Sequence, residues 1–278
     1  MLRDIVVHIP ADRSSQPVID CAVSIGNIFD AHVDGIACVY PAFDPLMAFE
    51  ASAANVAAIT AATQSNIDKA ASALDQFEIA ARRIGISHGA RCISNVTYDA
   101  TPLLTGISRL YDLSIVAQPD YSKPNRDALV PEALLFDSGR PILMVPYIYS
   151  GALKLDRILI CWDGGRQAAR AVHDAMPFLY RAKAIDVVAV NEDSATVGEA
   201  SSEALQKHLA RHDLSAEVQR ITADTANIFN VILSLVADKS TDLIVMGGYG
   251  HSKFREFLLG GVTRGIFETL TVPALISH

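Results

Sequence analysis

Short apolar runs alternate with longer amphipathic stretches along the second half of the chain. The apolar runs have the length of strands and cover residues 157–162, 185–190, 243–246 and 272–276. Between them, apolar residues recur with the i, i+3, i+4 spacing of a helix in residues 167–179, 203–211 and 227–236. Continuous apolar strands separated by helices are typical of a parallel sheet covered on both faces. The pattern therefore predicts a doubly wound α/β domain of about five strands.

The same pattern occurs twice along the chain, with a period of about half its length. Three apolar segments of the first half have counterparts in the second: 4–9 and 157–162, 111–116 and 241–246, and 140–144 and 272–276. We therefore predict two duplicated domains, over residues 1–148 and 154–278. The linker between them is expected within residues 146–155, with Ser150 and Gly151 as its most flexible point.

The first half differs from the second by a long alanine-rich stretch. Residues 51–83 have a composition that strongly favours a helix. Two prolines in residues 40–45 predict a loop in front of it. The helix is also a candidate surface for a further homodimer.

Composition excludes several classes of protein. The chain has 278 residues with a formal net charge of −8, so it lacks the basic surface that nucleic-acid binding needs. No segment approaches the ~18 uninterrupted apolar residues of a membrane span, and the start is too short and too acidic for a signal peptide. The four cysteines lie far apart with no C-x-x-C pair. These features predict a reduced, cytoplasmic protein that binds neither nucleic acid nor membrane.

A glycine-rich segment follows the strand at 243–246 and carries the best chemical signal. Gly247, Gly248 and Gly250 stand at the carboxyl end of a parallel strand, where open α/β sheets bind ligands. A second glycine pair then opens a helix whose N–H groups are suited to an anion, at Gly260, Gly261, Val262 and Thr263. The plainer interpretation is that Gly247 and Gly248 only form a tight turn from strand to helix.

Neither of the common nucleotide fingerprints, G-x-x-x-x-G-K-[ST] and G-x-G-x-x-G after a strand, occurs. The spacing of Gly247, Gly250 and Gly260 instead resembles the nucleotide-binding signature of the universal stress protein family. The Asp163-Gly164 pair after a strand and the final strand at 272–276 are similar to that family too. The resemblance covers the chain as a tandem pair. It implies two doubly wound, five-stranded parallel-sheet domains of the Rossmann-like, adenine nucleotide alpha hydrolase-like type.

The resemblance implies a set of ATP-binding positions in the second half. In ATP-binding members, the residue matching Asp163 contacts the adenosine, and the one matching Val190 contacts the adenine through its backbone. The remaining matching positions hold ribose and phosphates, with Ser252 as a further hydroxyl in the same loop: Gly247, Gly250, Gly260, Gly261, Val262 and Thr263. The implied ligand is ATP, with Mg²⁺ as a candidate companion ion.

One position departs from the family pattern. Gly261 stands where the family usually has Ser or Thr. The helix N–H groups survive this change, but one hydroxyl donor to phosphate is lost, at a cost of ~1 kcal/mol.

The first half has lost the signature. Its corresponding loop, 117–124, has no glycine and has two prolines, which remove backbone donors. Pro10 occupies the position that matches Asp163, and Asp12 is a weak substitute two residues further on. We therefore expect no ATP in the first half, which is structural or binds another ligand.

Other candidate residues carry weaker signals. His208 and His212 have the i, i+4 spacing of a metal pair, but Lys207 and Arg211 bring like charge, which favours a solvated helix face. Trp162 precedes Asp163 and points to the opposite side by strand alternation, which favours core packing. No Ser/His/Asp or Cys/His set can be assembled from spacing alone.

The leading hypothesis is a regulatory stress-response protein that binds ATP in its C-terminal domain, with at most a slow ATPase activity because no general base is evident. The alternative is a module of the same fold that binds partners or a ligand other than a nucleotide. An adenylating enzyme of a related fold is disfavoured, because such enzymes usually need a loop rich in Ser and Gly after the first strand. Here only Gly164, Gly165 and Arg166 follow Asp163.

The terminal strands of the two halves predict how the halves meet. Strands this apolar, at 141–145 and 273–277, invite pairing if their edges are left open. A short linker holds them at an effective concentration of around a millimolar or more. We therefore predict that they pair antiparallel and form an internal pseudo-dimer.

Overall fold

The structure is a computed structural model of the chain. It describes residues 2–40, 42, 53–94, 100–120, 126–192, 199–224, 227–248 and 269–278. Among these residues, no helix is both long enough and apolar enough to cross a membrane.

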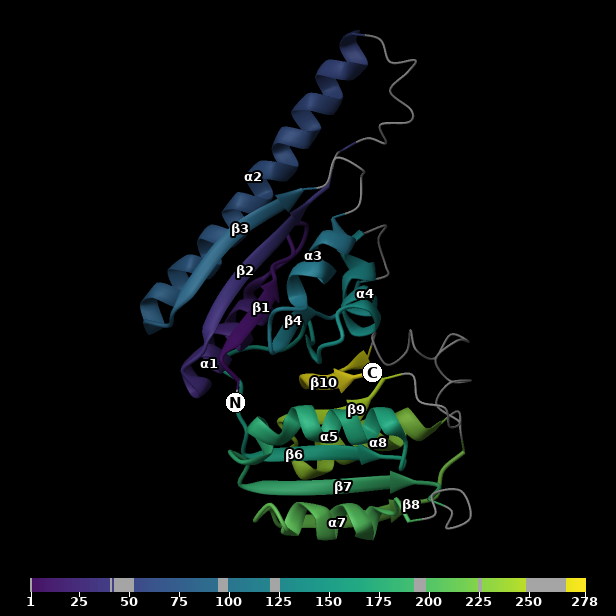
Figure 1. Cartoon of the computed structure of the whole chain (residues 1–278). Coiled ribbons are helices and arrows are strands. Elements are labelled where there is room, and N and C mark those ends of the chain that lie inside the picture. The colour runs from purple at the N-terminus through teal and green to yellow at the C-terminus, as the bar shows by residue number, and fades with distance from the viewer. Residues whose placement is uncertain are drawn as a thin grey trace.

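Strands and helices alternate through both halves (Figure 1). The first half contains β1 (Asp4–His8), α1 (Gln16–Phe29), β2 (His32–Val39), α2 (Ala53–Ile84), β3 (His88–Ser94), α3 (Thr101–Ser108), β4 (Leu113–Ala117), the 3-10 helix η2 (Arg126–Leu129), α4 (Val130–Asp137) and β5 (Ile142–Val145). The second half contains β6 (Arg157–Trp162), α5 (Arg166–Leu179), β7 (Ala184–Val190), α7 (Ser202–Ala210), β8 (Ala216–Ile221), α8 (Ile228–Lys239), β9 (Leu243–Gly247) and β10 (Ala274–Ser277).

All these strands form one sheet, in the order β3-β2-β1-β4-β5-β10-β9-β6-β7-β8. Within each half the neighbouring strands are parallel. At the junction β5 and β10 pair antiparallel, with Leu143 opposite Leu275. The predicted α/β fold with parallel sheets is confirmed, and so is the predicted antiparallel pairing of the two terminal strands.

Each face of the sheet carries a core layer that runs across both halves. One layer is covered by α1, α2, α5 and α7 and includes Phe77 and Phe178, both fully buried. The other is covered by α3, α4 and α8. Side chains of one strand enter the two layers alternately, as Val6 and Val7 do. This explains why the interior strands are apolar at successive positions.

The predicted alanine-rich helix is present as α2, of 32 residues, or about 48 Å at 1.5 Å per residue. Its second half packs on the sheet through buried residues that include Leu74 and Phe77. Residues 56–69 of the helix are mostly exposed, and this end of α2 projects beyond the sheet (Figure 1).

Candidate functional site

A pocket lies at the carboxyl edge of the second half, at the ends of β6, β7 and β9. The chain leaves β6 for β7 on one side, while β9 lies on the other side of β6. This is the switch point of the sheet, where open α/β folds bind ligands. Asp163, Val190 and Gly247 all line this one pocket. The other predicted site residues lie outside the described part of the chain: Gly250, Ser252, Gly260, Gly261, Val262 and Thr263.

One wall of the pocket is apolar and belongs to the sheet. Cys161 of β6 is paired with Val188 of β7 and with Met246 of β9, so the three side chains share one face. Ile232 of α8 and the side chain of Val190 complete the wall. Such a wall suits a flat apolar group.

The residues after β6 form a tight turn around Asp163. The Asp163 Oδ1 atom accepts a hydrogen bond of 2.8 Å from the Gly165 N–H. Gly164 has a φ of 73°, which favours glycine, and a Cβ on Gly165 would lie 2.9 Å from Asp163 Oδ1. The two glycines therefore allow the carboxylate to lie beside the start of α5.

Gly247 has a structural reason to be glycine. A Cβ at this position would lie 2.5 Å from the Ala168 nitrogen and 2.7 Å from the Gln167 carbonyl carbon. These are backbone atoms of the first turn of α5, so the close approach of β9 to α5 requires the glycine. This packing role stands beside the predicted role in ligand binding.

The end of β7 is held rigidly by Asn191. Its backbone is left-handed, with a φ of 53°, and its side chain exchanges two hydrogen bonds with the Ala223 backbone, of 2.7 and 2.9 Å. The Asn191 N–H donates to the Ile221 carbonyl of β8. Because the described peptide bonds are trans, the Val190 carbonyl points the other way, toward the end of β6. The structure thus directs a backbone acceptor toward the pocket side of β7.

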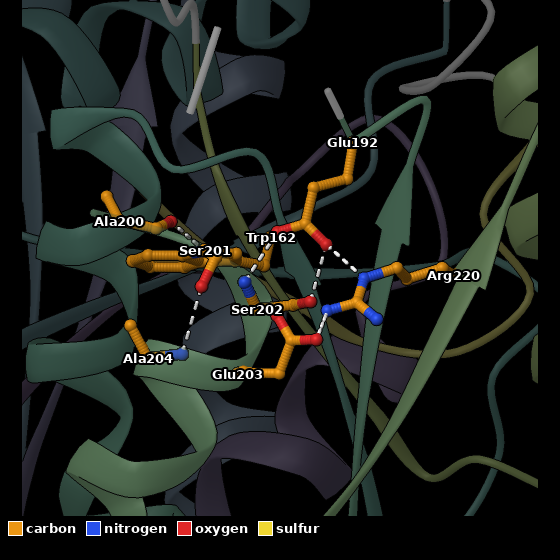
Figure 2. A network of polar contacts seen from close by, with 8 residues as sticks. All are labelled: Trp162, Glu192, Ala200, Ser201, Ser202, Glu203, Ala204 and Arg220. Carbon is orange, nitrogen blue, oxygen red and sulfur yellow. Dashed lines mark hydrogen bonds and ion pairs between the residues drawn. The ribbon is translucent and has the colours of Figure 1, made fainter. Parts of the chain in front are cut away.

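Glu192 joins the end of β7 to α7 and β8 (Figure 2). Its carboxylate accepts hydrogen bonds from the Ser202 N–H at 2.5 Å, the Ser202 Oγ at 2.6 Å and the Arg220 Nε at 2.5 Å. Burial alone would raise the pKa of Glu192, but the bonds from Ser202 and Arg220 lower it. Arg220 also contacts Glu203, and Ser201 caps α7 by accepting from the Ala204 N–H at 3.2 Å. The network fixes the start of α7.

Comparison with known proteins gives the second half a family. The family model described as "Universal stress protein family" matches residues 154–278. Residues 154–278 belong to the universal stress protein family. A search of curated protein sequences finds no match for the chain.

Solved structures extend the likeness to the whole chain. A universal stress protein from Archaeoglobus fulgidus DSM 4304 is 16% identical, with a TM-score of 0.70 over 98% of this chain and 95% of that one. A functionally unknown protein from Pseudomonas aeruginosa PAO1 is 17% identical, with a TM-score of 0.60 over 99% of this chain and 92% of that one. At these identities the likeness shows the fold, in both halves.

Several residues that line the pocket were not among the predicted site residues. Cys161, Val188 and Met246 are detectable in principle, because they alternate with buried residues near the ends of three predicted strands. Trp162 lies in the core as predicted, with 9% of its surface exposed, and its Nε1 donates to the Ala200 carbonyl at 2.9 Å. Gln167, in the first turn of α5, has no sequence signal that marks it.

The first half holds a buried ion pair at the corresponding edge. By strand register, His8 of the first half occupies the position that is equivalent to Cys161 of the second half. Cys38 likewise occupies the position equivalent to Val190. The His8 Nε2 lies 3.4 Å from the Asp127 Oδ1, and both side chains are almost fully buried. Burial alone would lower the pKa of His8, but Asp127 and a hydrogen bond with Cys38 raise it to about 10. Charged side chains of the protein therefore occupy the place of the apolar wall.

The two histidines with metal spacing lie on the surface. His208 and His212 are exposed, as expected of a solvated face, and their rings are 4.8 Å apart. The His212 Nδ1 lies 3.3 Å from the Tyr180 hydroxyl. Within the described ranges, no three His, Cys, Asp or Glu side chains are grouped to hold a metal ion.

Proposed function

We propose that the second half binds an adenine nucleotide, with ATP as the ligand, and that this binding serves regulation in the stress response. The observation that carries the proposal is the pocket itself. Its lining includes Asp163, directly after β6, together with Val190 and Gly247, the last residues of β7 and β9. Membership of residues 154–278 in the universal stress protein family supports it.

The described residues of the pocket fit an adenine nucleotide. The apolar wall of Cys161, Val188 and Met246 suits an adenine ring, and the Val190 carbonyl is directed to accept from its amino group. Asp163 offers an acceptor for a ribose hydroxyl. Gly250, Ser252, Gly260, Gly261, Val262 and Thr263 remain the proposed phosphate positions, on the family resemblance.

On this proposal the second half is a binding module with at most a slow ATPase activity. Burial and the nearby Asp163 raise the pKa of the Cys161 thiol to about 12, so this pocket residue stays protonated. Mg²⁺ would arrive with the phosphates, because oxygen ligands from phosphates and water are the ones it prefers.

A second candidate function is a module of the same fold that binds partners or a different ligand, for which Gly261 is the supporting feature. Mass spectrometry of ligand released from freshly purified protein separates the two. Bound adenine nucleotide supports the first proposal. An empty protein whose melting temperature does not change with millimolar ATP supports the second.

Two further features belong to the proposal. We infer a cytoplasmic protein, consistent with its composition and cysteine usage. We also infer that the two halves act as an internal pseudo-dimer around the β5–β10 pair, with α2 as the candidate surface for a further homodimer.

Asp163→Ala tests the site directly. We expect it to weaken ATP binding about tenfold or more, because a charged acceptor is lost, while Asp12→Ala, an exposed residue of the first half, leaves binding unchanged. Titration calorimetry of the two variants and the wild-type chain decides it. Equal losses from both variants would overturn a single site in the second half.

A further inference from the structure

Gln167 carries a buried polar atom that nothing in the described structure satisfies. It is the second residue of α5, it lines the pocket, and only 3% of its surface is exposed. Its Oε1 atom has no hydrogen-bond partner among the residues that the structure describes. Buried amide oxygens are nearly always paired, because an unpaired one has lost its water without compensation.

Among the described residues that line the pocket, only two side chains near Gln167 can donate: Trp162, whose Nε1 already donates to the Ala200 carbonyl, and Cys161, whose thiol is a weak donor. The sheet side is formed by Cys161, Val188, Val190 and Met246, and Asp163 is itself an acceptor. The neighbouring strand contributes Gly247, which brings no side chain. Since no strong donor among the described residues is left for Oε1, a molecule bound in the pocket is the source that we consider for it.

Position indicates which part of a nucleotide supplies this donor. Gln167 and Asp163 both belong to the connection from β6 into α5, whereas the apolar wall lies on the sheet face. A flat base fits the apolar wall, and its amino group has the Val190 carbonyl as acceptor. The Gln167 Oε1 and the Asp163 carboxylate are two acceptors on the same β6–α5 connection, and together they suit the two hydroxyls of a ribose.

We propose that the Gln167 Oε1 accepts a hydrogen bond from a ribose hydroxyl, so that Gln167 makes this site select ribonucleotides over deoxyribonucleotides. The proposal rests on the proposed binding of an adenine nucleotide. It adds a specificity residue to that site.

The test compares ATP, 2′-deoxy-ATP and 3′-deoxy-ATP by titration calorimetry on the full chain. We expect the wild-type protein to bind ATP about tenfold more tightly than one of the two deoxy analogues. Gln167→Met keeps the side-chain length but removes the acceptor. It should weaken ATP about tenfold, leave that deoxy analogue unchanged, and so abolish the preference. Gln167→Glu keeps an acceptor and should retain the preference.

The melting temperature without ligand gives a second readout. Gln167→Met should melt at the same temperature as the wild type or higher, since it removes an unpaired buried oxygen. Gln206→Met is the matched control, because the Gln206 Nε2 donates to the Ala216 carbonyl at 2.7 Å. That variant should lose stability and keep the ribose preference.

The outcomes separate this inference from the proposed function. A wild-type protein that does not bind ATP overturns both. A wild-type protein that binds ATP and both analogues equally, or a Gln167→Met variant that keeps the preference, overturns only the role of Gln167.

Discussion

A single strand position sets the chemistry of each half. At the end of β6, Cys161 contributes a neutral thiol to an apolar wall. At the equivalent position of β1, His8 pairs with Asp127 and is held charged. The pKa of Asp127 is lowered by His8, Tyr40 and Arg13, although burial alone would raise it. One side leaves room for an apolar ligand, and the other is filled by the protein's own charges.

His8→Leu should destabilise the protein by about 3 kcal/mol at about pH 7, because it leaves Asp127 buried without its cation. The pKa of His8 is raised in the folded state, so its contribution is full below about pH 6.5 and is lost as the pH rises toward about 10. Urea denaturation at several pH values should show the gap between wild type and variant shrinking over that window. A gap that stays constant would mean that His8 is neutral in the folded protein.

At the scale of elements, the apolar pattern predicts strands whose two faces are buried and fails at the edges of the sheet. β3 and β8 are the outermost strands and have mostly exposed or half-exposed residues. A strand with one open edge need not be apolar, and charged residues there protect the edge. Because β8 has no apolar pattern, the sequence does not predict it as a strand. The position of its Arg220 beside Glu192 could therefore not be predicted either.

The candidate site was predictable where it depends on strand ends. Asp163, Val190 and Gly247 meet because the carboxyl ends of parallel strands lie at one edge. Gln167 was not predictable, because a polar residue in the first turn of an amphipathic helix is usually exposed. Its burial depends on β9 packing against that turn, which Gly247 permits.

Glu192→Gln tests the element that borders the pocket. It should cost about 1.5 kcal/mol, since charge-assisted hydrogen bonds to Ser202 and Arg220 are weakened. The amides of Ser202 and Ala204 should exchange hydrogen faster. Because the pKa of Glu192 is lowered in the folded state, its contribution is present at neutral pH and is lost in acid.

Glu217→Gln is the control on the same edge, because Glu217 is exposed and its only ion pair among the described residues, to Lys239, is 4.0 Å long. It should change stability by no more than a few tenths of a kcal/mol. Equal effects of Glu192→Gln and Glu217→Gln would mean that the network does not hold α7.

At the scale of the whole molecule, the two halves are joined by contacts in the sheet, between helices and through the linker. β5 and β10 join the sheet. Beside them, the Phe29 ring of α1 lies 5.0 Å from the Phe178 ring of α5, and the Arg181 guanidinium lies 4.4 Å over Phe29. The linker adds a third contact, because the Leu153 N–H donates to the Ser24 Oγ at 2.8 Å. The linker, which we expected to be most flexible at Ser150 and Gly151, is thus hydrogen-bonded to α1 two residues after Gly151.

The antiparallel junction also separates the two carboxyl edges. The strands of the first half are parallel to β5, and those of the second half are parallel to β10. Because β5 and β10 are antiparallel, the carboxyl edge with His8 and the one with Asp163 lie at opposite ends of the sheet. A ligand in the second half therefore does not meet the polar pair of the first.

Phe178→Ala tests whether this junction makes the halves one cooperative unit. Phe178 is fully buried at the contact with Phe29, so we expect a loss of about 3–5 kcal/mol. If the continuous sheet and the shared core layer couple the halves, hydrogen exchange should show buried amides of β1 and β6 losing protection together. Tyr180→Ala is the control, because 56% of Tyr180 is exposed, and it should change protection in neither half. Loss of protection in β6 alone would contradict the coupling and would show that β5 and β10 join two independently stable units.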